Sequence, residues 1–176
     1  MKDNDLPITV LMSVYNGEDY ICKSIDSILN QTFTNFEFVI VNDGSDDNTS
    51  SILYDYKRKD SRIQLIEHKN IGLTKSLNIG INSSNGYYIA RQDADDISYP
   101  ERLEKQYNYL QQNIDTVLLG TRHREIFNKK KVDGRVYKSE IKKVLRYINP
   151  FIHSSVMIQR EAFKKIDFYN EKMDTS

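Results

Sequence analysis

The order of buried strands and helices is the feature that most constrains the fold of this chain. Residues 7–15 are almost continuously apolar and rich in β-branched side chains, which is typical of a strand buried on both faces of a parallel sheet. An Asn-Gly turn and an amphipathic helical pattern over residues 18–30 follow. The same order occurs three more times, so the sequence predicts an α/β fold with a mostly parallel central sheet and helices on both faces.

The remaining elements follow from the same patterns. Further buried strands are predicted at residues 36–41, 62–67 and 87–91, and helices at 48–59, around Leu73, Leu77 and Ile81, and at 100–113. Beyond them we expect a strand at 116–120, a hairpin of residues 123–127 and 132–137, a helix at 141–148, a strand at 155–158 and a helix at 160–166. The 176 residues fit one domain, 1–176, with frayed ends at residues 1–6 and 171–176.

Polar residues interrupt the apolar runs where the predicted strands end. Tyr15 and Asn16 follow the first strand, Asp43 the second, Asn70 the third, and an acidic cluster at residues 93–96 the fourth. In open parallel sheets, ligands bind at the carboxyl ends of the strands. We therefore expect these residues to meet in one functional site.

The acidic cluster holds three carboxylates, Asp93, Asp95 and Asp96, within four residues. Neighbouring carboxylates repel one another, and a bound cation removes that repulsion. Mg²⁺ and Mn²⁺ favour carboxylate oxygens and often keep phosphate oxygens as further ligands, so the cluster predicts half of a metal site that a diphosphate completes. The alternative is an acidic loop followed by a helix cap at Ser98, just before Pro100.

Charge and composition exclude several classes of protein. Lys+Arg and Asp+Glu balance at 25 each, which gives no case for a nucleic-acid partner. The polar start and the short apolar runs indicate neither a signal sequence nor a membrane span, and the single cysteine fits a reducing compartment, so we expect a cytoplasmic protein. The G-x-G-x-x-G, P-loop and G-x-S-x-G motifs are absent. Each of the three histidines fits a polar surface or capping position, and for His153, which precedes a buried strand, the alternative is a position that faces the site.

Five short motifs carry a resemblance to a known family. In chain order they are Val14-Tyr15-Asn16-Gly17-Glu18, Ile40-Val41-Asn42-Asp43-Gly44-Ser45, Asn70-Ile71-Gly72-Leu73-Thr74, Ala90-Arg91-Gln92-Asp93-Ala94-Asp95-Asp96 and Pro100-Glu101-Arg102-Leu103. Together they resemble family 2 glycosyltransferases of the GT-A fold, from about residue 8 to residue 170. The resemblance implies transfer of a sugar from a UDP-sugar to a saccharide or lipid-linked acceptor, with inversion and with Mn²⁺ or Mg²⁺ as cofactor. It also implies a role in bacterial surface polysaccharide synthesis.

The resemblance assigns roles to residues at the strand ends. Ser13 and Tyr15 would line the base pocket, with the Tyr15 ring against uracil, and the Asp43 carboxylate would accept the uracil N3–H. Asp95 would ligate the metal, and Asp93 would hold the ribose or a water on the metal, with support from Asp96. The other nucleotide-sugar contacts that it implies are Asn16, Glu18, Asn70, Lys75, Arg91 and Ala94, and His153 is a further candidate metal ligand.

Two positions depart from the family pattern. Many members carry an arginine directly before the residue corresponding to Asn78, where it meets the diphosphate, but here that residue is Leu77 and Lys75 is the nearest cation. The family's general base lies in an acidic motif that follows the segment resembling residues 168–172. That motif is expected to begin at about residue 174, so we expect the base beyond residue 176 and an incomplete acceptor part.

Three other functions fit parts of the pattern. A nucleotide-sugar-binding module would keep the pocket without turnover. A D-x-D-x-[TV] phosphohydrolase nearly matches residues 93–97, although Ile97 replaces the Thr or Val and the motif follows the fourth strand instead of the first. A phospho-accepting receiver domain would need an acidic pair after the first strand, where Tyr15 and Asn16 stand. The lysines at 129–131 form either a solvated face or a peripheral contact with the inner face of a membrane.

Overall fold

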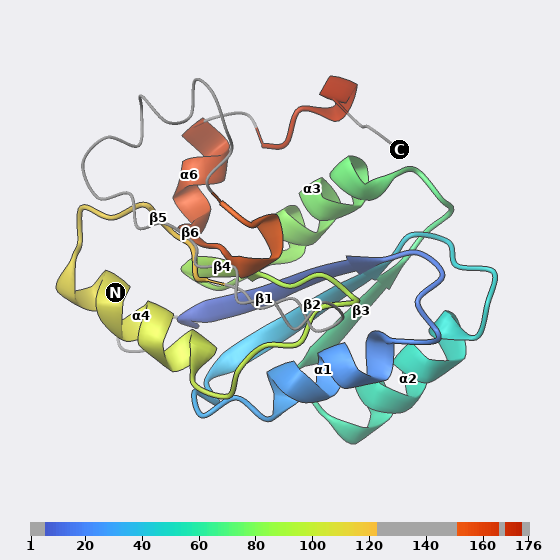
Figure 1. Ribbon diagram of the computed structural model, residues 1–176. Helices are drawn as coiled ribbons and strands as arrows, with labels where there is room; N and C mark the ends of the chain where they lie inside the picture. Colours follow the sequence, from blue (N-terminus) through green and yellow to red (C-terminus); the bar gives the residue numbers. More distant parts are fainter. Residues whose placement is uncertain (1–5, 123–150, 166–167, 174–176) are drawn as a thin grey trace.

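Six strands form one sheet in the part of the chain that the computed structural model describes, residues 6–122, 151–165 and 168–173 (Figure 1). The strand order across the sheet is β3-β2-β1-β4-β6-β5. Their bounds are β1 Ile8–Val14, β2 Phe36–Asn42, β3 Ile63–Glu67, β4 Tyr88–Arg91, β5 Leu118–Leu119 and β6 Met157–Gln159. Strands β1 to β4 run parallel, whereas β6 pairs antiparallel with both β4 and β5. The mostly parallel α/β sheet that the sequence predicts is confirmed.

Helices cover both faces of this sheet, as predicted (Figure 1). Three helices pack on one face: α1 Ile21–Leu29, α2 Thr49–Lys59 and α4 Arg102–Gln112. Two helices pack on the other face: α3 Leu73–Ser83 and α6 Arg160–Lys165. Two 3₁₀ turns, η1 His153–Ser155 and η2 Glu171–Met173, flank β6 and α6 in the sequence. No helix in the described ranges is both long enough and apolar enough to cross a lipid bilayer.

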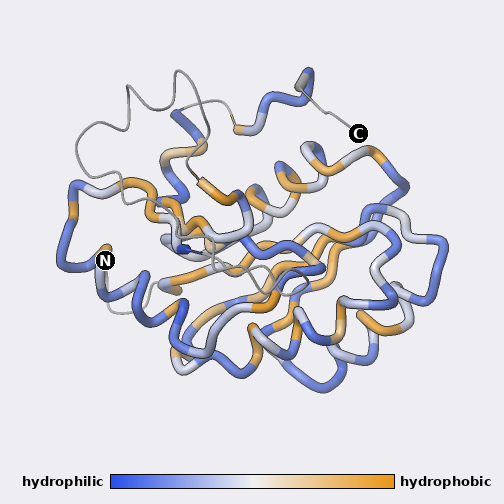
Figure 2. Tube along the Cα trace, viewed as in Figure 1, coloured by the Kyte–Doolittle hydropathy of each residue, from blue (hydrophilic) through white to orange (hydrophobic). Residues whose placement is uncertain are grey.

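The alternation of side chains along β1 divides the core into two layers. Val10 and Met12 point into the layer that contains α1, α2 and α4, while Leu11 points toward α3 and α6, and all three side chains are fully buried. Figure 2 shows hydrophobic residues along the central strands and mostly hydrophilic residues in the connecting loops. The polar loops that follow β1, β2 and β4 therefore extend from a fully packed core.

The C-terminal part differs in detail from the sequence prediction. The strand expected at 116–120 is only the two-residue β5, and β6 begins at Met157 because residues 153–155 form η1. Within the ends predicted to fray, the Leu6 carbonyl accepts a hydrogen bond from Tyr87 N–H and residues 171–173 form η2, and the fraying itself stays a prediction. The hairpin at 123–137, the helix at 141–148 and the lysines at 129–131 lie outside the described residues.

Gly86 shows why the turn before β4 needs a residue without a side chain. A Cβ at this position would lie 2.2 Å from Thr9 N and 2.5 Å from the Ile8 carbonyl carbon, both of which are backbone atoms of β1. The Gly86 N–H also donates to Thr9 Oγ1 at 2.9 Å, so β1 and the turn are held in direct contact.

Replacing Gly86 by Ala tests this close approach. The new methyl group must push β4 away from β1, and we expect the free energy of unfolding to fall by about 1–3 kcal/mol, as for other overpacked cores. Urea denaturation of both proteins measures the change. A variant with an unchanged midpoint would contradict the tight contact between the turn and β1.

Candidate functional site

An open pocket lies at the carboxyl ends of β1 and β4, the edge at which the sequence predicts a site. Its volume is about 230 Å³. Its walls come from β1 and the loop after it, the turn after β4, the start of α3, and η1: Ser13, Val14, Tyr15, Tyr20, Leu73, Asp93, Ala94, Asp95 and His153. The structure therefore brings the residues predicted for the base pocket, the acidic cluster and the candidate histidine into one cavity.

The loop after β1 forms the aromatic wall of the pocket. Tyr15 is 48% exposed, so part of its surface is accessible to a ligand, whereas Ser13 is buried. Asn16 turns the chain with a left-handed φ of 51°, a conformation that asparagine tolerates better than most residues. The Tyr20 hydroxyl donates to the Asn16 carbonyl at 3.1 Å, which fixes a second ring beside Tyr15.

The acidic turn is anchored by Arg91, the last residue of β4. The Arg91 side chain is fully buried, and its Nη2 lies 2.6 Å from Asp93 Oδ1. Its Nη1 donates to the carbonyls of Leu11 and Gln92 at 2.8 and 3.0 Å. The Arg91 guanidinium is completely buried and binds Asp93 and two backbone carbonyls, so its contact with the nucleotide-sugar stays a prediction. Arg91 fixes one carboxylate oxygen of Asp93.

The carboxylates of the acidic turn do not form a complete protein cage for a metal. Among the described residues, no three His, Cys, Asp or Glu side chains are close enough together to hold an ion. Asp93 and Asp95 both line the pocket, whereas Asp96 is exposed and is not part of its lining. One or two carboxylates are the usual protein contribution to Mg²⁺ or Mn²⁺ sites that are completed by water and substrate phosphates. The donor set therefore fits an ion that is shared with a diphosphate.

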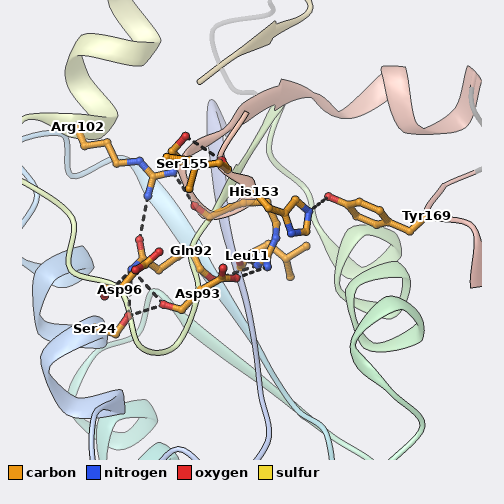
Figure 3. Close-up of polar contacts among 11 residues, drawn as sticks. Leu11, Ser24, Gln92, Asp93, Asp96, Arg102, His153, Ser155 and Tyr169 are labelled. Atoms are coloured by element: carbon orange, nitrogen blue, oxygen red, sulfur yellow. Dashed lines mark hydrogen bonds and ion pairs between the residues drawn. The ribbon is translucent and has the colours of Figure 1, made fainter. Parts of the chain in front are cut away.

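His153 is present in the pocket as a neutral base. Its Nε2 lies 2.7 Å from the Tyr169 hydroxyl, and the two rings meet edge to face (Figure 3). Burial, with a further contribution from the nearby Arg91 charge, lowers the pKa of His153 to about 4. At neutral pH the imidazole is therefore uncharged and keeps a lone pair, which agrees with its prediction as a residue that faces the site.

Asp43 is not among the residues that line the pocket, and both of its carboxylate oxygens accept hydrogen bonds from backbone N–H groups. The side chain is buried, and its two carboxylate oxygens accept hydrogen bonds from the N–H groups of Ile71 and Gly72 at 2.8 and 3.0 Å. The Asp43 carboxylate thus holds the loop that precedes α3, and the exposed Asn70 belongs to that loop. Its predicted bond to the uracil N3–H would have to share these oxygens with backbone donors, and that role stays a prediction.

Two other predicted contact residues connect loops to each other. Asn16 Oδ1 accepts from the Asp46 N–H at 2.9 Å, and Glu18 Oε2 accepts from the Asn48 N–H at 2.9 Å. These bonds tie the loop after β1 to the loop after β2. Lys75 is exposed in the first turn of α3 and is not among the residues that line the pocket. These three side chains therefore surround the site without lining it.

The sequence patterns do not predict the contacts of two further residues, Asn78 and Ser98. Asn78, inside α3, binds the C-terminal segment: its Oδ1 accepts from Tyr169 N–H at 3.0 Å, and its Nδ2 donates to the Tyr169 carbonyl at 3.0 Å and to Glu171 at 3.2 Å. These hydrogen bonds hold Tyr169 next to His153. Only the family position of Asn78, next to the missing arginine, pointed to this part of α3. Ser98 was considered as a helix cap, which is wrong, because its hydroxyl donates to Gln92 Oε1 and the N-cap residue of α4 is Glu101.

Comparison with known sequences identifies relatives along nearly the whole chain. A sequence model described as glycosyl transferase family 2 matches residues 9–167. An uncharacterized glycosyltransferase of Haemophilus influenzae is 39% identical over 167 residues, which cover 87% of this chain and 51% of that protein. The O-antigen biosynthesis glycosyltransferase WbnJ of Escherichia coli is 36% identical over 166 residues, which cover 90% of this chain and 63% of WbnJ. The chain thus spans about half to two thirds of the length of these curated relatives.

Solved structures share the fold at lower sequence identity. S. aureus TarS in complex with UDP-GlcNAc superposes with a TM-score of 0.75 at 22% identity, over 93% of this chain and 48% of that one. The mannosyltransferase PcManGT of Pyrobaculum calidifontis, in complex with GDP-Man and Mn²⁺, superposes with a TM-score of 0.69 at 19% identity, over 96% of this chain and 49% of that one. These likenesses confirm the GT-A architecture that the sequence resemblance implies.

The lowered pKa of His153 predicts a specific dependence of stability on pH. The unfolded chain binds a proton at His153 with a pKa near 6.5, while the folded chain binds it only near pH 4. The contribution of the neutral imidazole is therefore complete above pH 6.5 and is lost as the pH falls from 6.5 toward 4. Urea titrations at pH 7 and pH 5 should show that wild type loses more free energy of unfolding than His153→Gln does. Equal losses in both proteins would contradict the buried neutral state.

Removal of the Asn78 amide should loosen the C-terminal segment. Asn78→Ala deletes three hydrogen bonds, and we expect a loss of about 1–3 kcal/mol together with faster hydrogen exchange at the Tyr169 amide. Asn82→Ala is the matched control, because Asn82 lies one turn further along α3 and is exposed. If Tyr169 exchanges equally fast in both variants, Asn78 does not hold this segment.

Proposed function

The chain belongs to glycosyl transferase family 2, and on that premise we propose that its pocket binds a UDP-sugar together with a divalent cation. The sugar is transferred, with inversion at its anomeric carbon, to a saccharide or lipid-linked acceptor. The reaction serves the synthesis of a bacterial surface polysaccharide, in the cytoplasm at the inner face of the membrane. The observation that carries this proposal is that Tyr15, Asp93 and Asp95 line the same open pocket at the carboxyl ends of β1 and β4.

The aromatic wall supports a nucleoside in the pocket. The half-exposed Tyr15 ring offers a flat apolar face on which a base can stack. Stacking accepts any base, so selection of uracil needs polar groups, and Asp43 with the loop at residues 70–72 is the nearest predicted source. Structural relatives have been solved with UDP-GlcNAc and with GDP-Man, so comparing UDP with GDP tests this choice directly.

The acidic turn supports the diphosphate end of the donor. The proposed ligands of Mn²⁺ or Mg²⁺ are Asp95 and the Asp93 oxygen that Arg91 does not hold, with the neutral His153 of the same pocket as a further candidate. When bound, such a cation supplies Lewis-acid stabilisation of the charge that develops on the leaving diphosphate. Asp93 is held in place by Arg91, so its free oxygen needs little rearrangement to meet the ligand.

A binding module without turnover is the second candidate function. It is favoured by one observation: both carboxylates among the residues that line the pocket are assigned to the cation, which leaves none of them as the general base. The two candidates share the nucleotide and the cation and differ only in the transfer step. Because the chain spans only about half to two thirds of its relatives' length, release of UDP from a UDP-sugar in the presence of acceptor separates them when it is measured on a chain extended at its C-terminus.

Calorimetric titration of UDP tests the shared part of the proposal. With Mn²⁺ we expect a micromolar Kd, about −8 kcal/mol, for wild type. Binding should be much weaker in EDTA and in Asp95→Ala with Mn²⁺, because the diphosphate then lacks its counter-ion. GDP should bind more weakly than UDP under the same conditions.

The control variant is Asp115→Ala, which removes an exposed carboxylate that is not part of the pocket and should bind UDP like wild type. Absence of UDP binding with and without Mn²⁺ would refute the proposed donor site. Tight binding that Asp95→Ala leaves intact would refute the proposed cation ligand.

A further inference from the structure

The acidic turn, residues 93–96, accepts hydrogen bonds from the side chain of one buried glutamine, Gln92. This side chain is 1% exposed and directly precedes the three carboxylates. Its Nε2 lies 3.2 Å from the Asp93 carbonyl and 2.8 Å from the Asp96 carbonyl, as well as 3.1 Å from Ser24 Oγ on α1 (Figure 3). One amide group thus fixes both ends of the turn that carries the carboxylates and attaches it to α1.

The other end of the Gln92 amide is fixed just as firmly. Its Oε1 accepts hydrogen bonds from Ser98 Oγ at 2.7 Å and from Arg102 Nη1 at 2.9 Å. Arg102 also donates to the Arg91 carbonyl at 2.6 Å and to Gln106 Oε1 at 3.1 Å, and Gln106 reaches the Ser155 carbonyl at 3.0 Å. Arg102 belongs to the Pro-Glu-Arg-Leu motif, for which the pocket itself offers no role.

The charges around the turn explain why an arginine is buried there. The Arg102 side chain is nearly inaccessible, and its hydrogen-bond acceptors are the neutral oxygens of Gln92, Ser98, Gln106 and Arg91. The nearby Asp93 and Asp96 charges favour its charged form, although burial and Arg91 lower its pKa to about 10. The two buried guanidinium groups therefore lie close to the carboxylates of Asp93 and Asp96, and their positive charges offset part of the repulsion within the turn. The turn is held together before any cation arrives.

We propose that Gln92, oriented by Arg102, is a positioning residue that sets the carboxylates of Asp93 and Asp95 for the cation shared with the donor diphosphate. This inference rests on the proposed function, because it concerns the same site. Residues that orient metal ligands affect metal affinity strongly without touching the ion. The Gln92 amide reaches the pocket only through the backbone of the turn, so it acts on the carboxylates and not on the ligand.

A second buried glutamine in the same region supplies a matched control. Gln31 is 3% exposed, and its Nε2 donates to the carbonyls of Ser27 and Tyr99 at 2.9 and 2.8 Å. Its Oε1 accepts from Leu103 N–H at 3.0 Å. It therefore performs the same structural task as Gln92, but its bonds reach the segment after the carboxylates and not the turn itself.

The test compares Gln92→Glu with Gln31→Glu. Each change keeps the shape of the side chain, removes its N–H donors and brings a carboxylate oxygen against backbone carbonyls. UDP is titrated with Mn²⁺ and with EDTA at a temperature where circular dichroism shows every protein folded. We expect Gln92→Glu to weaken Mn²⁺-dependent UDP binding about 10- to 100-fold, the usual range for residues that orient metal ligands. Its affinity in EDTA should stay that of wild type, and Gln31→Glu should match wild type in both conditions.

Equal effects of the two substitutions, or loss of UDP affinity in EDTA as well, would overturn the inference and leave only a structural role for Gln92. Failure of wild type to bind UDP with Mn²⁺ is a different result, because it refutes the proposed function itself.

If Gln92→Glu does not fold, hydrogen exchange of wild type in EDTA is measured instead. We expect the Asp96 and Ser98 amides, which donate to the Asp93 carbonyl and to Ser27 Oγ, to be protected before Mn²⁺ is added. Protection that appears only with Mn²⁺ would contradict a turn assembled in advance.

Discussion

The ion pair between Arg91 and Asp93 is the interaction on which the rest of the site depends. The Arg91 guanidinium is fully buried at the end of β4, and a buried cation is unfavourable unless a carboxylate and hydrogen-bond acceptors surround it. Its second nitrogen binds the Leu11 carbonyl, so the same group joins β1, β4 and the acidic turn. Burial lowers the pKa of His153 and of Arg102, and the Arg91 charge lowers both further. Arg91 therefore affects both the geometry and the electrostatics of the pocket.

The sheet topology explains how distant segments meet around this pair. Parallel strands β1 and β4 are neighbours, so their carboxyl ends place the Tyr15 loop beside the acidic turn. The antiparallel β6 runs the other way along β4, and the residues that precede β6 therefore lie at the same edge of the sheet. That reversal is what brings His153 into the pocket. Asn78, on α3, then holds Tyr169 against His153 and completes this wall.

Much of the fold followed from the sequence because local patterns determine it. The parallel strands and the helices from α1 to α4 appear where apolar runs and helical spacing predict them, and Ser13, Tyr15, Asp93, Ala94, Asp95 and His153 line the pocket. Other features depend on packing that local patterns do not reveal. The sequence does not show that the Arg91 side chain is fully buried, and Ser98 looks like a helix cap although its hydroxyl donates to Gln92. Asn78 and Tyr169 are 91 positions apart, so no local spacing links them.

β6 also closes an edge of the sheet. Strand β4 pairs with β1 on one side and with β6 on the other. Because β6 comes much later in the sequence, that second side of β4 stays unpaired until β6 has been synthesised. Chains are synthesised from the N-terminus, so the parallel part of the sheet is available for folding while that side of β4 is still unpaired. An open apolar edge such as Tyr88-Ile89-Ala90 is a template for pairing with other chains. The growing polypeptide is therefore most prone to aggregation between the synthesis of β4 and that of β6, and the strand that brings His153 to the pocket is also the one that ends this exposure.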